Sequence, residues 1–425
     1  MNSLKYYKKL LTVIIFYDYS YDTKKSLSLF SSDLSFARLS IRFLAIILAL
    51  PLALLAWIIL RVIFFQYKVS IYVLKTFRPG WASTYLNMME PLCRQIQQEN
   101  NSRHIKILIE PGNAVSEILV KSYTPHFTMY LDDRRKFMRL IAFLIPKSGL
   151  EKKFINTSDK YLESWLYPPS INYANLENQV PSDLARMGIE KENYVIFAHP
   201  SRNYYRNRLT SSQLQDIELR FFDLSTYSQA LKKIIENNLK VVRVGVQVDE
   251  LPIEFKAIPL LDYTGAIRNE ASELWLYENC RFLVSVCNGA FWFARRFERP
   301  SIVTNSYGLY AGYLPTLYTL MTLRSKKSGN LLSFANMLEL RKKPGFLSYQ
   351  FMNNHSLELL PNSSLTIVNA INDVFNLLDQ KQISSQEDNE LMDRYRALLG
   401  EFGIPVAEKM TLPAISFLKE YKHLL

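Results

Sequence analysis

The 425-residue sequence predicts an α/β protein made of two parallel-sheet halves that face a cleft, preceded by a membrane-associated helix. Two observations predict the sheets: short apolar runs alternate with segments of helical periodicity, and about ten helical residues separate successive runs. This spacing is typical of right-handed crossovers between parallel strands, so each half is expected to be Rossmann-like. The third observation is one long apolar run in the first quarter of the chain, which predicts the helix.

The apolar run Phe43 to Leu60 reads FLAIILALPLALLAWIIL and is the strongest in the chain. At about 1.5 Å per residue it reaches ~27 Å, close to the ~30 Å hydrocarbon core of a bilayer. Arg42 and Arg61 flank it. We therefore expect a membrane-associated helix at about 43–65. Because Pro51 lies in its middle, a full span, a re-entrant segment and a buried core helix all stay open.

The net charge of +12, from 51 Lys and Arg against 39 Asp and Glu, is concentrated around this apolar run. Residues 1–104 contain thirteen basic and five acidic residues, so they carry +8 of the total. No nucleic-acid-binding motif accompanies the remaining +4. The charge therefore favours an anionic membrane surface and a phosphorylated substrate as partners, and no nucleic acid is expected.

Four parts are expected along the chain. They are a basic N-terminal segment with the membrane helix at 1–75, an α/β domain with its connection at 76–180, a second α/β domain at 181–380, and a helical tail at 381–425. In the first α/β domain the expected elements are strands at 104–110 and 127–131, helices at 113–121 and 134–144, and a polar connection at 147–181.

The second α/β domain has the clearer alternation of strand and helix patterns. The expected elements are strands at 194–198, 239–244, 257–261, 282–286 and 301–304, helices at 225–236, 270–279 and 287–297, and a polar loop at 199–212. In an open parallel sheet, ligands bind beyond the carboxyl ends of the strands. That rule selects His199 and Arg202, Arg243 and Gly245, Asp262 and Tyr263, Ser285 to Gly289, and Asn305 to Tyr307.

The turn Cys287-Asn288-Gly289 joins a strand directly to a helix. A helix start offers free backbone N–H groups to phosphate, and Gly289 removes the side chain that would block close approach. An ordinary turn capped by Asn288 is the alternative. Arg202 and Arg243, at the ends of neighbouring strands, would together clamp a diphosphate, although either could also be a surface arginine.

Several familiar sites are missing from the sequence. It contains no G-x-G-x-x-G, no G-x-x-x-x-G-K-[ST] and no D-x-D pair for a divalent ion under a nucleotide sugar. Three cysteines without a C-x-x-C, and five scattered histidines, do not have zinc-ligand spacing. No metal and no cofactor are therefore expected. A transferase of this kind would stabilise a leaving diphosphate with arginines and a helix dipole.

From about Pro181 onwards, the chain resembles a family of bacterial glycosyltransferase-like proteins encoded with polysaccharide biosynthesis genes. The C-terminal domain of that family is similar to fucosyltransferase-type GT-B enzymes. The order and spacing of several segments carry the resemblance, whereas the first 180 residues share only the general layout. The matching segments are Leu184–Tyr205, Leu219–Leu231, Val241–Gly245, Leu261–Asn305, Ser328–Leu338 and the ending AISFLKEYKHLL.

The resemblance implies roles for individual motifs. The family's H-x-R corresponds to His199-Pro-Ser-Arg202, with one extra residue, and implies that Arg202 contacts the donor diphosphate. The family's Y-R-N-x-D corresponds to Leu219–Asp223, which keeps Arg220 and Asp223. The D-Y strand end is kept at Asp262-Tyr263, and the phosphate turn corresponds to Cys287-Asn288-Gly289.

The leading hypothesis is a metal-independent GT-B-like glycosyltransferase at the bacterial inner membrane, with its catalytic domain in the cytoplasm. It would move a sugar from a nucleoside-diphosphate sugar to a glycan or lipid-linked acceptor in surface polysaccharide synthesis. The alternatives are a non-catalytic nucleotide-sugar or glycan-binding scaffold with a degenerate transferase fold, and a membrane-anchored interaction protein. The catalytic candidates are Arg202, His199 and Asp223; the substrate-binding candidates are Arg220, Arg243, Gly245, Asp262, Tyr263, Ser285, Asn288, Gly289 and Asn305.

Overall fold

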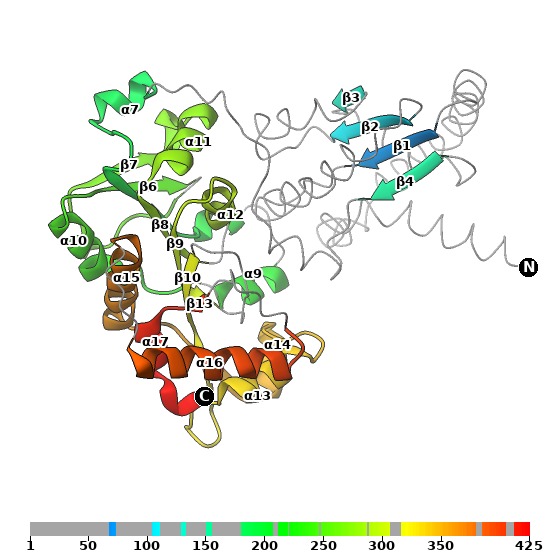
Figure 1. Cartoon of the computed structure of the whole chain (residues 1–425), viewed down its shortest axis with the longest axis vertical. Helices are drawn as coiled ribbons and strands as arrows, with labels where there is room; N and C mark the ends of the chain where they lie inside the picture. The colour runs from blue at the N-terminus through cyan, green and yellow to red at the C-terminus, as the bar shows by residue number, and fades with distance from the viewer. Residues whose placement is uncertain are drawn as a thin grey trace, which may run out of the picture.

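The computed structural model describes two sheets and the helices around the second of them (Figure 1). The described residues are 68–73, 104–110, 129–132, 150–154, 180–206, 211–219, 221–245, 248–286, 289–306, 316–379, 385–404 and 412–425. The membrane helix expected at 43–65 and the helices expected at 113–121 and 134–144 lie outside them. Within the described ranges, no helix has the length and apolar character needed to cross a membrane.

The first sheet has four parallel strands in the order β3-β2-β1-β4. Its strands are β1 (Lys68–Val73), β2 (His104–Glu110), β3 (Met129–Asp132) and β4 (Leu150–Phe154). The strands expected at 104–110 and 127–131 are present. Strand β4 corrects the expectation of a polar connection from residue 147 onward, because LEKKF pairs with β1. An edge strand has one unpaired side, where charged residues are common, so its polar sequence gave no strand pattern.

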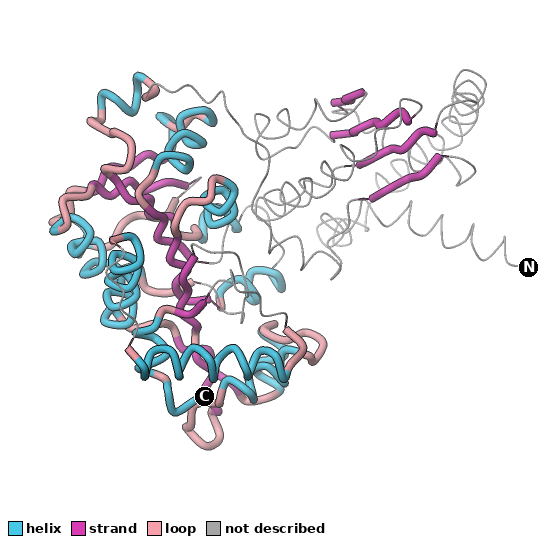
Figure 2. The backbone as a smooth tube through the Cα atoms, in the orientation of Figure 1, coloured by secondary structure: helices cyan, strands magenta, loops and turns pink. Residues whose placement is uncertain are grey.

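The second sheet has seven parallel strands in the order β13-β10-β9-β8-β5-β6-β7. Its strands are β5 (Tyr194–Ala198), β6 (Lys240–Gly245), β7 (Leu260–Thr264), β8 (Phe282–Val286), β9 (Ser301–Ser306), β10 (Thr316–Leu320) and β13 (Leu412–Pro413). The two sheets confirm the predicted α/β class with parallel strands (Figure 2).

The strand order reverses between β5 and β8. From β5 the chain builds outward through β6 to β7, then returns to the other side of β5 and continues through β8, β9 and β10. Connections that leave neighbouring strands in opposite directions separate at this point, and ligands of open α/β sheets bind there. The carboxyl ends of β5 and β8, at Ala198 and Val286, therefore lie at this reversal.

Helices cover both faces of the seven-stranded sheet (Figure 1). Helix α10 (Ser228–Glu236), preceded by the short helix η4 (Leu224–Tyr227), packs with α15 (Ser364–Leu378) on one face. Helices α11 (Glu270–Asn279) and α12 (Gly289–Arg296) lie on the other face. The remaining elements are α7 (Ser182–Arg186), α8 (Arg202–Arg206), α9 (Ser211–Glu218), α13 (Phe334–Arg341), α14 (Tyr349–Asn354), α16 (Gln386–Glu401), α17 (Ile415–Glu420), the short helices η5 (Ile253–Phe255), η6 (Gly265–Ile267) and η7 (Lys422–Leu424), and the antiparallel pair β11 (Thr322–Ser325) and β12 (Leu357–Leu360).

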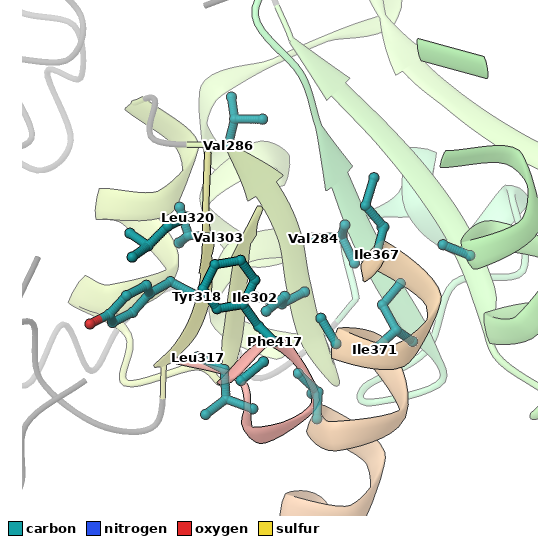
Figure 3. Close-up of a cluster of buried hydrophobic side chains, with 14 of the residues drawn as sticks. Val284, Val286, Ile302, Val303, Leu317, Tyr318, Leu320, Ile367, Ile371 and Phe417 are labelled. Carbon is teal, nitrogen blue, oxygen red and sulfur yellow. The ribbon is translucent and has the colours of Figure 1, made fainter. Parts of the chain in front are cut away.

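The larger core lies between the sheet and α15 (Figure 3). Ile367 and Ile371 of α15 point toward the strands, and neither is exposed to solvent. Phe417 of α17 is equally buried and fills the space beside Tyr318 of β10. Burying such a side chain contributes about 1.5–3 kcal/mol, so these contacts attach residues 412–425 firmly to the sheet.

Several element boundaries differ from the sequence expectations. The loop expected at 199–212 contains α8 and the start of α9. The strand expected at 257–261 is β7 at 260–264, because Pro259 has no N–H to give to the ladder. Strand β9 extends to Ser306, which places Asn305 inside a strand. The expected tail at 381–425 contributes β13 to the sheet and shares its core.

Candidate functional site

His199 follows β5 directly and lies in an aromatic cage at the strand-order reversal. Its ring stands edge-on to Phe222 and Tyr227, with ring centres 5.8 and 5.9 Å away, and it contacts Phe197. The Nδ1 atom lies 2.8 Å from the carbonyl oxygen of Pro200. The Nε2 atom is buried and has no hydrogen-bond partner among the described residues. Burial lowers the pKa of His199 to about 4, so the ring is neutral at physiological pH.

Asp249, in the loop after β6, holds the segment that follows His199. Its carboxylate accepts hydrogen bonds from the backbone N–H groups of Arg202 (2.9 Å) and Asn203 (3.1 Å) and from the Ser201 hydroxyl (3.0 Å). Burial alone would raise the pKa of Asp249, but these hydrogen bonds outweigh burial and lower it. The carboxylate therefore stays ionised and fixes the first turn of α8.

Sequence reasoning missed Asp249. It lies four residues after Gly245, beyond the strand end that the rule selected, and its partners are more than forty residues earlier in the chain. The available signal was an acidic residue in a loop at the same sheet edge as an N–H-rich helix start. Gly245 itself has a φ of +153°, and a Cβ there would lie 2.8 Å from a methyl group of Val248. Glycine is therefore required where the β6 chain turns toward Asp249.

Arg243 is nearly buried, with 8% of its side chain exposed, and its guanidinium is already engaged. Its Nη1 atom lies 3.3 Å from Oδ2 of Asp262, the residue paired with it on β7, and its Nη2 donates to the backbone carbonyl of Asp249. Burial lowers the pKa of Arg243, and Asp262 opposes that effect. This arginine therefore joins the ends of β6 and β7 and supports the Asp249 loop.

Arg202, at the start of α8, is more exposed. Its Nε donates to Glu218 at 3.2 Å, and 42% of the Arg202 side chain and 53% of the Glu218 side chain are accessible. The guanidinium also lies 4.9 Å from the ring centre of Phe221. An ion pair this exposed contributes little free energy, so an anionic ligand can replace Glu218 at small cost. Arg220 lies outside the described residues.

Asp223 caps the helix that begins with η4. Its carboxylate accepts from the backbone N–H of Ser225 at 2.9 Å and from the Ser225 hydroxyl at 2.6 Å. These hydrogen bonds lower its pKa. The helical segment expected at 225–236 therefore begins one residue earlier, at Leu224, and Asp223 is its capping side chain.

Tyr263 faces away from the other candidates. It is fully buried within β7, where its hydroxyl donates to Asp183 at 2.9 Å and accepts from the backbone N–H of Asn269. Its neighbour Asp262 lies on the opposite face with Arg243. Successive residues of a strand point to opposite faces, so the Asp262-Tyr263 pair does not converge on one ligand.

The ends of β8 and β9 contribute buried polar groups. The Asn305 side chain donates to the hydroxyl of Tyr227 at 3.1 Å and accepts from the backbone N–H of Asn362 at 2.6 Å. Tyr227 also bonds Thr304, whose hydroxyl donates to the carbonyl of Ser285. Because Tyr227 contacts the His199 ring, this network continues from β9 to the end of β5.

The structure thus brings together most of the described candidates at one sheet edge. Asp249 joins the backbone of Arg202 to Arg243, and Arg243 in turn pairs with Asp262. Tyr227 joins Asn305 to the ring of His199. Tyr263 does not belong to this group. Asn288 lies outside the described residues, and Gly289 begins α12. No group of three or more His, Cys, Asp or Glu that would hold a metal ion occurs in the described part of the chain.

No family model matches the chain, and no curated protein matches it. Solved structures with a similar fold include a glycosyl transferase family 9 protein from Veillonella parvula, at 10% identity over 60% of this chain and 86% of that chain, with a TM-score of 0.40. They also include TibC, an iron-containing heptosyltransferase of enterotoxigenic E. coli, solved with ADP-D-β-D-heptose (13% identity, 74% and 76% coverage, TM-score 0.40).

E. coli heptosyltransferase II is a further similar structure, at 14% identity over 56% of this chain and 84% of that chain, with a TM-score of 0.35. At these identities and TM-scores, the likeness carries no functional argument.

Proposed function

We propose that the chain is a glycosyltransferase that moves a sugar from a nucleoside-diphosphate sugar to a glycan or lipid-linked acceptor. The observation that carries the proposal is the rigid His199–Arg202 segment at the strand-order reversal, fixed by Asp249 and ending in an exposed arginine. Nucleotide ligands of open parallel sheets bind at this position. The sequence resemblance of residues 181–425 to GT-B-like enzymes supports the same reaction class.

In the proposed reaction, an acceptor hydroxyl attacks the anomeric carbon of the donor sugar. The bond from that carbon to the diphosphate oxygen breaks, and the diphosphate leaves with the bonding electrons. Arg202 would neutralise the leaving group by exchanging its exposed partner Glu218 for the diphosphate. The start of α12 at Gly289 would add backbone N–H groups. Arg202 and the helix start would together balance the negative charge of the leaving diphosphate without a metal ion, and metal independence is part of the proposal.

Arg243 takes a different role from the one expected. Its guanidinium is occupied by Asp262 and by the backbone of Asp249. We therefore propose that Arg243 positions the loop that carries Asp249. The proton of the attacking acceptor hydroxyl must pass to a base, and His199 and Asp223 are the catalytic candidates for that role. Asp223 is occupied by Ser225. His199 is the better candidate, because its Nε2 has no partner among the described residues.

The donor site is tested by nucleotide binding to the full-length protein in detergent. GDP, UDP, ADP and CMP are added separately, and thermal unfolding and calorimetric binding are measured. At least one nucleotide is expected to stabilise the protein, and Arg202→Ala is expected to weaken its binding by about tenfold or more. The control is Arg206→Ala, an exposed arginine one turn along α8. Absence of any nucleotide effect in the wild-type protein would sink the donor-site proposal.

A non-catalytic nucleotide-sugar-binding scaffold is the second candidate. Two features favour it: the extra residue in His199-Pro-Ser-Arg202, and the use of the Asp223 carboxylate as a helix cap. The two proposed functions are distinguished by measuring the release of nucleoside diphosphate from the nucleotide sugars that the protein binds. Binding without release in the presence of glycolipid extracts would favour the scaffold.

We further propose that residues 43–65 attach the protein to the bacterial inner membrane, with the catalytic domain on the cytoplasmic side. The apolar run Phe43 to Leu60 and its surrounding positive charge support this. Membranes from cells that make the full-length protein are washed at alkaline pH, and the protein is expected to stay in the pellet. Recovery of the protein in the wash would contradict membrane insertion.

A further inference from the structure

The protonation state of His199 follows from its neighbour Pro200. The Nδ1 atom lies 2.8 Å from the Pro200 carbonyl oxygen, and a carbonyl oxygen only accepts hydrogen bonds. Nδ1 is therefore the nitrogen that carries a proton. The pKa of about 4 excludes a second proton near neutral pH, so Nε2 presents a lone pair.

Among the described residues, no group pairs with this buried lone pair of Nε2. The ring is packed against Phe222 and Tyr227, and the described residues offer Nε2 no donor. A buried acceptor without a partner is unfavourable by about the cost of desolvating it, so such groups are rare outside functional sites. The hydroxyl of Tyr227, one of the rings packed against His199, is already used by Thr304 and Asn305.

A lone pair cannot recognise a phosphate. Phosphate oxygens at neutral pH are acceptors, and two acceptors facing each other repel. The matching group is a neutral donor, and a nucleotide sugar or its glycan acceptor offers hydroxyl groups for this purpose. Arg202, only three residues away, supplies the cationic donors that phosphate requires. The His199–Arg202 segment therefore carries one acceptor and one cation three residues apart.

We propose that Nε2 of His199 accepts a hydrogen bond from a substrate hydroxyl group, while Arg202 takes the diphosphate. This inference rests on the proposed function. It assigns hydroxyl binding to His199 and phosphate binding to Arg202. Because Nε2 is buried, the hydroxyl reaches it only by displacing a group that now covers the ring, so a local rearrangement accompanies binding.

The test uses full-length protein labelled with ¹⁵N-histidine, in detergent at neutral pH. The His199 signals are identified by their loss in His199→Gln. The free protein is expected to show a protonated Nδ1 and an unprotonated Nε2. Addition of a nucleotide or nucleotide sugar that binds should shift the Nε2 signal without protonating it, whereas sodium pyrophosphate should leave it in place.

Two variants give a second measurement. His199→Phe fills the aromatic cage but removes the acceptor, and it is expected to weaken binding of the hydroxyl-bearing ligand about 5- to 10-fold. His199→Gln keeps an acceptor oxygen and should recover part of the loss. Pyrophosphate affinity should be the same in both variants and the wild-type protein. Thermal unfolding of each variant verifies that it is folded.

The ligand that moves the Nε2 signal identifies the hydroxyl. A nucleoside diphosphate alone points to the ribose, a nucleotide sugar to the donor sugar, and a glycan alone to the acceptor; each supports the inference. Protonation of Nε2 by pyrophosphate overturns it. So does an Nε2 signal that stays in place with every nucleotide, nucleotide sugar and glycan that binds, while His199→Phe binds the same ligands with unchanged affinity. If no nucleotide or nucleotide sugar binds at all, the proposed function fails together with this inference.

Discussion

The carboxylate of Asp249 accepts a hydrogen bond from the backbone N–H of Arg202 at 2.9 Å, although 47 residues separate them in the sequence. The contact joins the loop after β6 to the helix start after β5. Arg243 reinforces it by donating to the Asp249 carbonyl. Two loops from neighbouring strands therefore hold each other, and the geometry of the candidate site depends on both.

Asp249→Ala should destabilise the protein and weaken nucleotide binding, although Asp249 is not expected to touch the ligand. The substitution leaves two backbone N–H groups and one hydroxyl without their acceptor, at a cost of about 2–4 kcal/mol. Urea unfolding measures the stability, and calorimetry measures the affinity. Glu250→Ala, at the exposed neighbouring position, is the matched control and should change neither. Wild-type affinity in Asp249→Ala would show that the segment holds its shape unaided.

Removing the acidic partner of an arginine should lower the free energy of unfolding more when the arginine is buried than when it is exposed. Asp262→Ala leaves the guanidinium of Arg243, 8% exposed, without its carboxylate, and should lower the free energy of unfolding by about 2–4 kcal/mol. Glu218→Ala removes the partner of Arg202, which is 42% exposed, and should cost less than about 1 kcal/mol. Urea unfolding of the two variants side by side provides the comparison. Equal losses would contradict the difference in burial.

Stability should depend on His199 in mildly acidic solution. The pKa of His199 is about 4 in the folded protein, against 6.5 for an unperturbed histidine, because burial disfavours the charged ring. As pH falls below 6.5, the unfolded chain takes up the proton first, so folding becomes less favourable. The contribution is complete above pH 6.5 and is lost as pH falls toward 4, by at most about 3 kcal/mol.

The measurement is thermal unfolding of wild-type protein and His199→Phe between pH 7 and pH 4. Other acidic groups titrate in both proteins, so the difference between them isolates His199. The wild-type protein should lose more stability than the variant over this range. Parallel pH profiles would show that the ring is better solvated than its contacts indicate.

Asn362→Ala should be strongly destabilising. Its side chain, in a residue that is 3% exposed, accepts from the Asn305 backbone and from Thr319 and donates to the carbonyl of Leu320. Leaving these buried groups unpaired should cost about 2–4 kcal/mol. Asn353→Ala, at an exposed position, is the control. Unfolding midpoints in urea that agree to within error for both variants would contradict a structural role for the network.

Local sequence patterns predicted five of the seven strands of the larger sheet, because these five contain short apolar runs. Strand β10, which reads TLYTL, and the two-residue strand β13 lack such a run and were not predicted. The apolar run at 257–261 placed β7 three residues too early. Pro259 has no N–H to donate to a neighbouring strand, so the strand begins only after it, and an apolar pattern does not show this. That shift moved Asp262 and Tyr263 from a strand end into a strand. Their side chains consequently face opposite ways, and only Asp262 lies with the candidate site.

The site was less predictable than the strands because its decisive contacts are non-local. The rule of strand ends selected His199, Arg202 and Arg243, but it could not distinguish the exposed arginine from the buried one. That difference depends on Asp249, whose loop folds back over β6. The network of Asn305 with Asn362 likewise joins residues 57 positions apart, and no local pattern specifies it.

Strand β13 has a consequence for the order in which the protein is made. Residues 412–413 pair with β10, Ala414 donates to the Tyr318 carbonyl, and Phe417 fills the core beside it. A ribosome produces these residues after every other strand of the sheet, so the β10 edge stays open while the rest of the domain folds. Until residues 412–425 emerge, the nascent chain exposes the unpaired edge of β10 and the apolar surface that Phe417 later covers. Chaperones bind such surfaces, and other nascent chains made on the same mRNA can associate with them.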